Sequence, residues 1–442
     1  MAYLSNSEAD IREMLEVIGF ENVEELLSNI PQDLRFKGTF NIPEAESELG
    51  ISRIVQQLAE KNKTYVSFLG GGAYDHYIPS IIDALTSRSE FYTSYTPYQP
   101  EVSQGNLQAM YEFQSMICEL TEMDITNASM YEAGSALAEA VLVAAGHTGK
   151  NKILIPATLN SRYKQIIETY INNTEIELTV IPDKDLTIDH TALKSLIDDQ
   201  IAAVIVQHPN YFGFFEDVAA IKNAAAGKDC LIIQVYDPTS LGLLKTPGAF
   251  GVDIAVAEGQ SLGNGQNYGG PFLGLFSVNE SLVRKIPGRL SGVTKDEDGK
   301  RGFVLTLQTR EQHIRREKAT SNICTNSGLM ALTAGIYMST LGKKGIKDVA
   351  GLCLQKAHYL AKELTAIPGI SMASKSPFFK EFTLSLPVKA EDVIKAALKE
   401  GIFAGIDLKK SGHANKILIA VTEQRTREEL DKYIQFYKKY LK

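Results

Sequence analysis

The sequence predicts an α/β protein whose large domain is a mainly parallel sheet that helices cover on both faces. Residues 151–278 alternate short apolar runs with connectors of helix length. Strands that are apolar on both faces and joined by helices are typical of parallel sheets buried between two helical layers. Beyond about residue 330 the expected order changes to helix, strand, strand, helix, strand and helix. This order predicts a smaller α+β domain at the C-terminal end.

Apolar periodicity places the individual elements. A helix is expected at about 107–120 and an alanine-rich helix at 136–145. The strands that follow are expected at 151–156, 177–182, 202–209, 230–238, 253–259 and 271–278, with helices at 161–173, 189–200 and 216–227. We therefore expect three parts: a helical N-terminal arm (1–65), a large α/β domain (66–330) and a small α+β domain (331–442).

The N-terminal arm is predicted from two helical stripes. Ser7 and Asp10 have the spacing of a capping box, and apolar residues recur at helical spacing over 11–18 and again over 51–58. Two interpretations remain open at this point. The arm either wraps a partner subunit or forms a helical edge of the main domain.

Composition narrows the class of protein. The 442 residues carry a net charge of −8, which argues against nucleic acid or an anionic membrane as the main partner. No apolar run approaches the roughly 20 residues of a membrane span, and no secretory signal is visible at the start. The cysteines are widely spaced and form no C-x-x-C pair, so we expect reduced thiols, no metal site and a cytoplasmic location. They are Cys118, Cys230, Cys324 and Cys353.

Candidate functional groups gather where predicted strands end. Pro238 cannot donate to a sheet ladder, so the strand before it should end and leave the Asp237 carboxylate at the carboxyl edge of the sheet. His208, followed by a proline, falls at the same edge. The next strand leads into a glycine-rich segment, 259–271, and no lysine occurs between positions 245 and 285.

Two further stretches have unusual composition. Gly134 and Ser135 precede the alanine-rich helix, where free backbone N–H groups and a hydroxyl favour a phosphate, although close packing is the commoner reason for small residues there. The loop 91–105 combines aromatic, hydroxyl and amide groups with two prolines. Loops this rich in tyrosine usually line an interface or a pocket.

Long passages carry a resemblance to a known family. They read YTPYQPEVSQG (95–105), FQSMICELTEMDITNAS (113–129), QHPNYFG (207–213), GQSLGNGQNYGGP (259–271) and LQTREQHIRREKATSNICT (307–325). The chain resembles the pyridoxal-phosphate enzymes of fold type I. Within them it is most similar to the subunit 1 (alpha) branch of the two-subunit P-proteins of the glycine cleavage system. The fold expected from this resemblance is the aminotransferase-like one.

The resemblance implies a reaction and a division of labour. P-proteins are oxidoreductases that act on a CH–NH2 donor, converting glycine and the lipoyl arm of the H-protein into CO2 and an aminomethyl-dihydrolipoyl H-protein. In fold type I an aspartate at the place of Asp237 pairs with the pyridinium nitrogen, and a lysine one strand later forms the Schiff base. Here Gln260 and Ser261 stand where that lysine is expected. The cofactor lysine is therefore expected in subunit 2, and this chain is expected to bind no cofactor covalently.

The same resemblance sorts the candidate residues into two groups. One group marks a vestigial cofactor pocket: Gly134, Ser135, His208, Asp237, Gln260 and Ser261. The other could reach into the active site of the partner subunit, because fold-type I subunits commonly complete each other's pockets: Tyr95, Tyr98, Glu101 and Gln104. The vestigial pocket has a purely structural interpretation as well, since a duplicated fold can keep its shape after losing its chemistry.

Three functions remain in competition. The first is an obligate enzyme subunit that supports the active site of a lysine-bearing partner. The second is a non-catalytic scaffold or regulatory protein that keeps a vestigial pocket and binds a partner such as the H-protein. The third is a self-sufficient pyridoxal-phosphate enzyme that uses Lys245 or Lys285, which would require a topology unlike that of the family.

Overall fold

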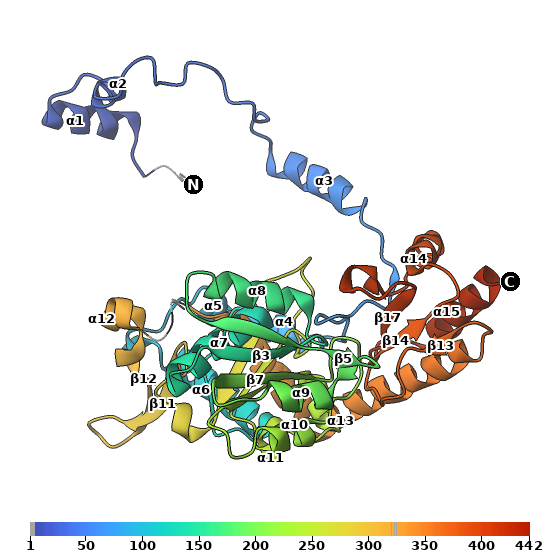
Figure 1. Cartoon of the computed structure of the whole chain (residues 1–442). Coiled ribbons are helices and arrows are strands. Elements are labelled where there is room, and N and C mark those ends of the chain that lie inside the picture. Colours follow the sequence, from blue (N-terminus) through green and yellow to red (C-terminus); the bar gives the residue numbers. More distant parts are fainter. Residues whose placement is uncertain (1–4, 320, 322, 324) are drawn as a thin grey trace. The chain divides into compact units, whose positions relative to one another are not determined.

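The computed structural model describes residues 5–319, 321, 323 and 325–442. The chain divides into two compact units, Met1–Lys63 and Thr64–Lys442, here called the N-terminal unit and the main unit. The N-terminal unit carries α1 (Glu8–Ile18), α2 (Val23–Leu26) and α3 (Glu48–Ala59), drawn in blue in Figure 1. The predicted capping box is confirmed at α1. The hydroxyl of Ser7 accepts the N–H of Asp10, whose carboxylate accepts the N–H of Ser7.

The N-terminal unit builds almost no core of its own. Among its described residues, 5–63, only Leu15 is buried. The apolar stripes of its two longer helices remain uncovered by the rest of the unit: Ile11, Met14, Ile18, Ile51, Ile54, Val55 and Leu58. An amphipathic helix gains most of its stability by burying such a stripe, so these helices need another surface to cover them.

The main unit is built on a seven-stranded sheet with the order β2-β10-β9-β8-β7-β3-β4. Its strands are β2 (Ile125–Thr126), β3 (Lys152–Pro156), β4 (Glu177–Ile181), β7 (Ile201–His208), β8 (Leu231–Tyr236), β9 (Ile254–Glu258) and β10 (Gly274–Val278). Every pairing is parallel except the two made by β10. All six strands expected between 151 and 278 are present, and the sheet is mainly parallel as predicted.

Helices cover both faces of this sheet (Figure 1). α7 (Ala133–Thr148) and α8 (Ser161–Ile171) pack on one face, and α6 (Gln104–Thr121), α9 (His190–Leu196) and α10 (Val218–Ala224) pack on the other. Side chains alternate along β3, so this strand contributes to the hydrophobic cores on both faces of the sheet. Ile153 and Ile155 enter the core beneath α7, while Leu154 enters the opposite core.

A long helix, α13 (Gly328–Thr365), runs from the seven-stranded sheet to a second, antiparallel sheet (Figure 1). Its helical geometry is broken at Gly342, where φ is 59° and ψ −175°. The second sheet has the order β13-β14-β17-β16 and packs against α14 and α15. Its elements are β13 (Ser371–Met372), β14 (Glu381–Ser385), α14 (Ala390–Lys399), β16 (Ile406–Asp407), β17 (Lys416–Ala420) and α15 (Arg427–Tyr440).

Shorter elements complete the main unit. The helices are α4 (Ile81–Thr86), α5 (Ser89–Tyr92), α11 (Pro247–Phe250) and α12 (Gln312–Arg315). The strands are β1 (Val66–Ser67), β5 (Asp183–Lys184), β6 (Thr187–Ile188), β11 (Leu290–Lys295), β12 (Arg301–Thr306) and β15 (Ile402–Phe403). β1 pairs with β15, so the first strand of the main unit joins its C-terminal part. Within the described residues, no helix is both long and apolar enough to cross a membrane.

Candidate functional site

The site lies at the carboxyl edge of the seven-stranded sheet, where β7, β8 and β9 end at His208, Tyr236 and Glu258. Asp237 follows β8 directly, as predicted, and caps the short helix η2 (Pro238–Gly242). Its Oδ1 accepts the N–H of Thr239 at 3.0 Å. Its other oxygen, Oδ2, remains available and points to a cation.

That cation is Lys380, which comes from the residue just before β14 in the second sheet. The Nζ of Lys380 lies 2.8 Å from Oδ2 of Asp237, and the lysine side chain is only 1% exposed. The same ammonium stands 3.7 Å from the ring centroid of Tyr74 and 3.0 Å from Nε2 of His76. A buried ammonium needs such partners, because an unpaired charge away from water is strongly destabilising.

Gln260, at the position expected for the cofactor lysine, is held by the backbone of Tyr74. Its Oε1 accepts the N–H of Tyr74 at 2.8 Å, and its Nε2 donates to the carbonyl of Tyr74 at 3.1 Å. A third bond joins Nε2 to the carbonyl of Asn264 at 2.7 Å. Ser261, beside it, is 3% exposed. The side-chain amide of Gln260 therefore holds the segment that carries Tyr74 against the segment that carries Asn264.

The N-terminus of α7, the predicted phosphate seat, is already capped by carboxylates of this chain. Glu132 accepts the N–H groups of both Gly134 and Ser135. Oε2 of Glu258 accepts the N–H of Ala133 at 3.1 Å. The expectation of free N–H groups here is wrong, since three consecutive donors point at two acids. Gly134 is small for packing reasons, because a Cβ there would stand 2.2 Å from a methyl carbon of Ile166.

A cavity of about 40 Å³ is all that remains between these groups. Asp237, Lys380, Glu258 and Tyr163 are among the residues that line it. A water needs roughly 10 to 15 Å³, whereas pockets for cofactor-sized ligands hold about 300 Å³ or more. The residues present therefore do not fit pyridoxal phosphate. The space suits two or three waters.

Buried acids surround this cavity. Glu381 accepts the hydroxyl of Tyr74 at 2.6 Å and the N–H of Gly71 at 2.7 Å. Burial raises the pKa of Glu381 to about 7. Burial also raises the pKa of Glu258 to about 8, against the opposing effect of its backbone donors. Both acids therefore bind protons in the range where ordinary carboxyl groups are ionised.

His208 is close in sequence to this cavity but does not line it. Its Nδ1 accepts the N–H of Glu216 at 3.2 Å, and its ring packs near Phe215 and Phe250. Burial lowers the pKa of His208 to about 4, so the ring is neutral at physiological pH. Its neighbours Gln207 and Pro209 line the cavity instead. The reason is the alternation along β7, which sends adjacent side chains to opposite faces.

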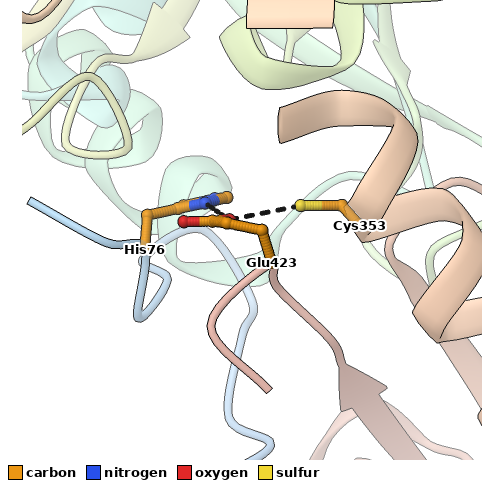
Figure 2. Close-up of side chains that lie close together, drawn as sticks. All are labelled: His76, Cys353 and Glu423. Carbon is orange, nitrogen blue, oxygen red and sulfur yellow. Dashed lines mark hydrogen bonds and ion pairs between the residues drawn. The ribbon is translucent and has the colours of Figure 1, made fainter. Parts of the chain in front are cut away.

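A second group of side chains adjoins Lys380 through His76. Figure 2 shows its members, His76, Glu423 and Cys353. Glu423 lies between His76 and Cys353. Its Oε2 is 2.6 Å from Nδ1 of His76 and 3.4 Å from Sγ of Cys353. Burial and the nearby charge of Lys380 lower the pKa of His76. Burial opposes ionisation of Glu423, but its hydrogen bonds with His76 and the N–H of Tyr77 lower its pKa to about 2.

The group His76, Cys353 and Glu423 has the residue types of a metal site, with ligand atoms within 4.8 Å of one another. Its hydrogen bonds indicate otherwise. The ammonium of Lys380 donates to Nε2 of His76, so the ring proton is on Nδ1 and points at Glu423. Tetrahedral zinc holds its ligands at about 2.0 to 2.3 Å, which sets ligand atoms roughly 3.3 Å apart. The 2.6 Å between Nδ1 and Oε2 is a hydrogen-bond distance.

The tyrosine-rich loop lies apart from the cavity. Tyr95 is 85% exposed, Glu101 is also exposed, and neither lines the 40 Å³ space. The hydroxyl of Tyr98 accepts a hydrogen bond from the buried Arg289 at 3.0 Å. Gln104 exchanges two hydrogen bonds with the backbone of Phe303 in β12, both at 2.8 Å. The base of the loop is thus fixed, and Tyr95 lines a separate cavity of about 170 Å³.

The two alternative lysines are not placed for cofactor chemistry. Lys245 is exposed, with its Nζ 4.6 Å from the ring centroid of Phe250, and Lys285 is half-buried. Neither is among the residues that line the cavity beside Asp237. The lysine that does reach Asp237 is Lys380, which the sequence patterns described above do not single out. The available signal was two adjacent charges, Lys380 and Glu381, inside the aromatic run 378–382, because charges in a buried strand must be paired.

Comparisons with known proteins agree with this architecture. The family model for the glycine cleavage system P-protein matches residues 1–437. A probable glycine dehydrogenase (decarboxylating) subunit 1 of Chloroherpeton thalassium is 50% identical over 441 residues, covering 99% of each chain. A crystal structure of glycine decarboxylase (P-protein) of the glycine cleavage system, in inhibitor-bound form, matches with a TM-score of 0.93 at 39% identity. That match covers 99% of this chain and 100% of the other.

A more distant structure shares the fold alone. A sphingosine-1-phosphate lyase of Burkholderia pseudomallei matches with a TM-score of 0.68 at 14% identity, covering 93% of this chain and 94% of that one. Together with the P-protein match, this likeness confirms the fold-type I architecture expected from the sequence. The name subunit 1, carried by the curated relatives, implies a second subunit. From residue 1 to residue 437, this chain belongs to the glycine cleavage system P-protein family.

Proposed function

We propose that this chain is subunit 1 of a two-subunit glycine decarboxylase, in which a lysine-bearing subunit 2 holds pyridoxal phosphate. One observation carries the division of labour. The expected lysine position holds Gln260, whose amide is bonded to Tyr74 and Asn264, beside a cavity of only about 40 Å³. A P-protein chain with such a pocket requires another chain to hold the cofactor.

The proposed reaction is that of the family. Subunit 2 decarboxylates glycine and transfers the aminomethyl group to the lipoyl arm of the H-protein, with the bound cofactor supplying the electron sink for the broken carbon–carbon bond. The cysteines are widely spaced and form no C-x-x-C pair, which favours the cytoplasm as the compartment.

The contribution of this chain is the tyrosine-rich loop, which we place at the mouth of the partner's active site. Tyr95 and Glu101 are exposed, while Tyr98 and Gln104 bond the loop to Arg289 and Phe303. A loop that is held at two points and still exposes polar side chains suits the positioning of a small substrate or of a lipoyl arm.

The N-terminal unit supports a heteromer as well. Its two longer helices carry apolar stripes that the unit itself leaves uncovered. We place these stripes against subunit 2, where they would bury apolar surface typical of a permanent interface. Replacing Ile54 and Leu58 in α3 with serine should then weaken the heteromer, as measured by analytical ultracentrifugation. The matched control replaces the polar Gln56 and Gln57 of the same helix.

Co-expression with subunit 2 tests the proposal. We expect glycine–bicarbonate exchange only when both chains are present, and none from this chain alone. Full activity of subunit 2 by itself would instead support the scaffold or regulatory function, which the closed pocket of this chain also allows. Exchange by this chain alone would contradict both.

A further inference from the structure

The pocket beside Asp237 has two electrostatic ends. One is the carboxylate of Asp237 at the end of β8, which attracts a cation. The other is the N-terminus of α7, whose backbone N–H groups and helix dipole attract an anion and which adjoins the cavity through Glu258, a lining residue that accepts the N–H of Ala133. Pyridoxal phosphate carries a pyridinium nitrogen at one end and a phosphate at the other, so a fold-type I pocket matches both of its charges.

The cation end is filled from within the chain. The ammonium of Lys380 is 2.8 Å from Asp237 and is almost completely buried. It also stands over the ring of Tyr74 and donates to His76, so its remaining directions are occupied. Lys380 belongs to the strand segment that leads into β14, and Asp237 belongs to the end of β8. The ion pair therefore joins the second sheet to the first.

The anion end is filled from within the chain as well. The carboxylate of Glu132 takes the N–H groups of Gly134 and Ser135, and Glu258 takes that of Ala133. These are the donors that a phosphate would need at this helix. A phosphate brought here would also meet the charge of Glu132, which repels it.

We propose that Lys380 and Glu132 are built-in replacements for the two charged ends of pyridoxal phosphate, closing this pocket to the cofactor and joining the two sheets without it. Three features then prevent cofactor binding: the absence of a lysine at 260, the ammonium of Lys380 beside Asp237, and the carboxylate of Glu132 at the N-terminus of α7. Restoring an amine by Gln260→Lys alone leaves both charged ends occupied and does not restore binding. This inference concerns the pocket of this chain and stands whether or not the proposed function is correct.

Equilibrium dialysis of the full chain against pyridoxine 5′-phosphate tests it. This probe has the ring nitrogen and the phosphate but no aldehyde, so it cannot react with surface lysines. We expect no saturable binding to the wild-type chain. The double variant Lys380→Met/Glu132→Ala should bind the probe saturably, with a dissociation constant at least about tenfold below the highest probe concentration used, and each single variant should bind more weakly than the double variant. The matched control is Lys395→Met/Glu391→Ala, which removes an exposed pair on α14 and should behave as wild type.

Two outcomes overturn the proposal. One is saturable wild-type binding that Asp237→Asn abolishes, since the pocket would then be open. The other is a folded double variant that binds no more tightly than the wild type. Circular dichroism establishes folding beforehand. If the double variant does not fold, Glu132→Ala alone decides the matter by thermal shift with inorganic phosphate. A rise in melting temperature absent from the wild type supports the proposal, and no rise contradicts it.

Discussion

The side-chain amide of Gln260 and the backbone of Tyr74 hold each other through a reciprocal pair of hydrogen bonds, 2.8 and 3.1 Å long, inside the main unit. The resemblance to fold-type I enzymes predicts the cofactor lysine at this position. Here the same position fixes the loop that carries Tyr74 and His76, which in turn contact Lys380. Gln260 therefore serves as a structural contact between segments that are distant in the sequence.

Replacing Gln260 with alanine should therefore destabilise the chain. The change leaves the buried N–H of Tyr74 and the carbonyl of Asn264 without this partner, and each such group costs about 1 to 3 kcal/mol. We expect a loss of roughly 2 to 4 kcal/mol in the free energy of unfolding, measured by urea denaturation. The control Gln108→Ala removes an exposed hydrogen bond to Glu112 and should stay within about 0.5 kcal/mol of the wild type. Equal losses in the two variants would contradict this assignment.

Breaking the Lys380–Asp237 pair from one side should cost more than removing it entirely. Lys380→Met leaves the Asp237 charge in a site that water barely reaches, with an expected cost of about 3 to 5 kcal/mol. Lys380→Met combined with Asp237→Asn removes both charges and should recover part of that loss. Denaturation midpoints of Lys380→Met, Asp237→Asn and the double variant give the interaction energy between the two charges. Additive losses would show that the two charges are independent.

The buried acid Glu381 predicts a pH dependence of stability. Its folded pKa of about 7 lies above its ordinary value of 4.5, so the folded chain holds a proton that the unfolded chain releases between these pH values. Its contribution is therefore greatest below about pH 4.5 and is lost as the pH rises towards 7. We expect the stability difference between wild type and Glu381→Gln to change by up to about 3 kcal/mol over this range. Glutamine can still accept from Gly71 and donate to Tyr74. A difference that does not vary with pH would contradict the raised pKa.

The sequence predicts the fold well because its signals are local. The strand ending at Asp237 follows from the apolar run and Pro238, and the cap of α1 follows from Ser7 and Asp10. The absence of a lysine at 260 is likewise visible without coordinates. These features depend on periodicity and on backbone chemistry, which neighbouring residues determine.

The contents of the pocket could not be predicted in the same way. Lys380 lies 143 positions after Asp237, and only the packing of β14 near the end of β8 brings their charges together. From the sequence alone, the N-terminus of α7 is expected to be an open anion-binding site. In the structure Glu258, at the end of β9, accepts the N–H of Ala133 there. The position of His208 at a strand end predicts a place in the pocket, but its ring bonds to the N–H of Glu216 while Gln207 lines the cavity. Contacts between segments that are distant in the sequence decide the first two cases, and the alternation of side chains along β7 decides the third.

Metal removal should leave the chain unchanged. His76 donates from Nδ1 to Glu423 while its Nε2 accepts from Lys380, so neither ring nitrogen offers a lone pair for a metal. We expect no stoichiometric zinc or iron by elemental analysis and no shift in melting temperature on adding EDTA. A drop of several degrees with the chelator, reversed by zinc and absent from Cys353→Ser, would establish a metal site there instead.

The exposed tyrosine loop yields the prediction that bears most directly on catalysis. Tyr95→Phe removes the hydroxyl of an exposed loop residue, so it should lower glycine–bicarbonate exchange in the reconstituted pair while leaving the subunits associated. Loss of one positioning hydrogen bond typically reduces a rate about tenfold. Tyr98→Phe also removes the bond from Arg289 and should reduce both activity and stability, the latter by about 1 kcal/mol. Tyr440→Phe, near the end of α15, serves as the control. Gel filtration of each pair separates a catalytic defect from dissociation, and unchanged kinetics in both loop variants would remove the loop from the active site.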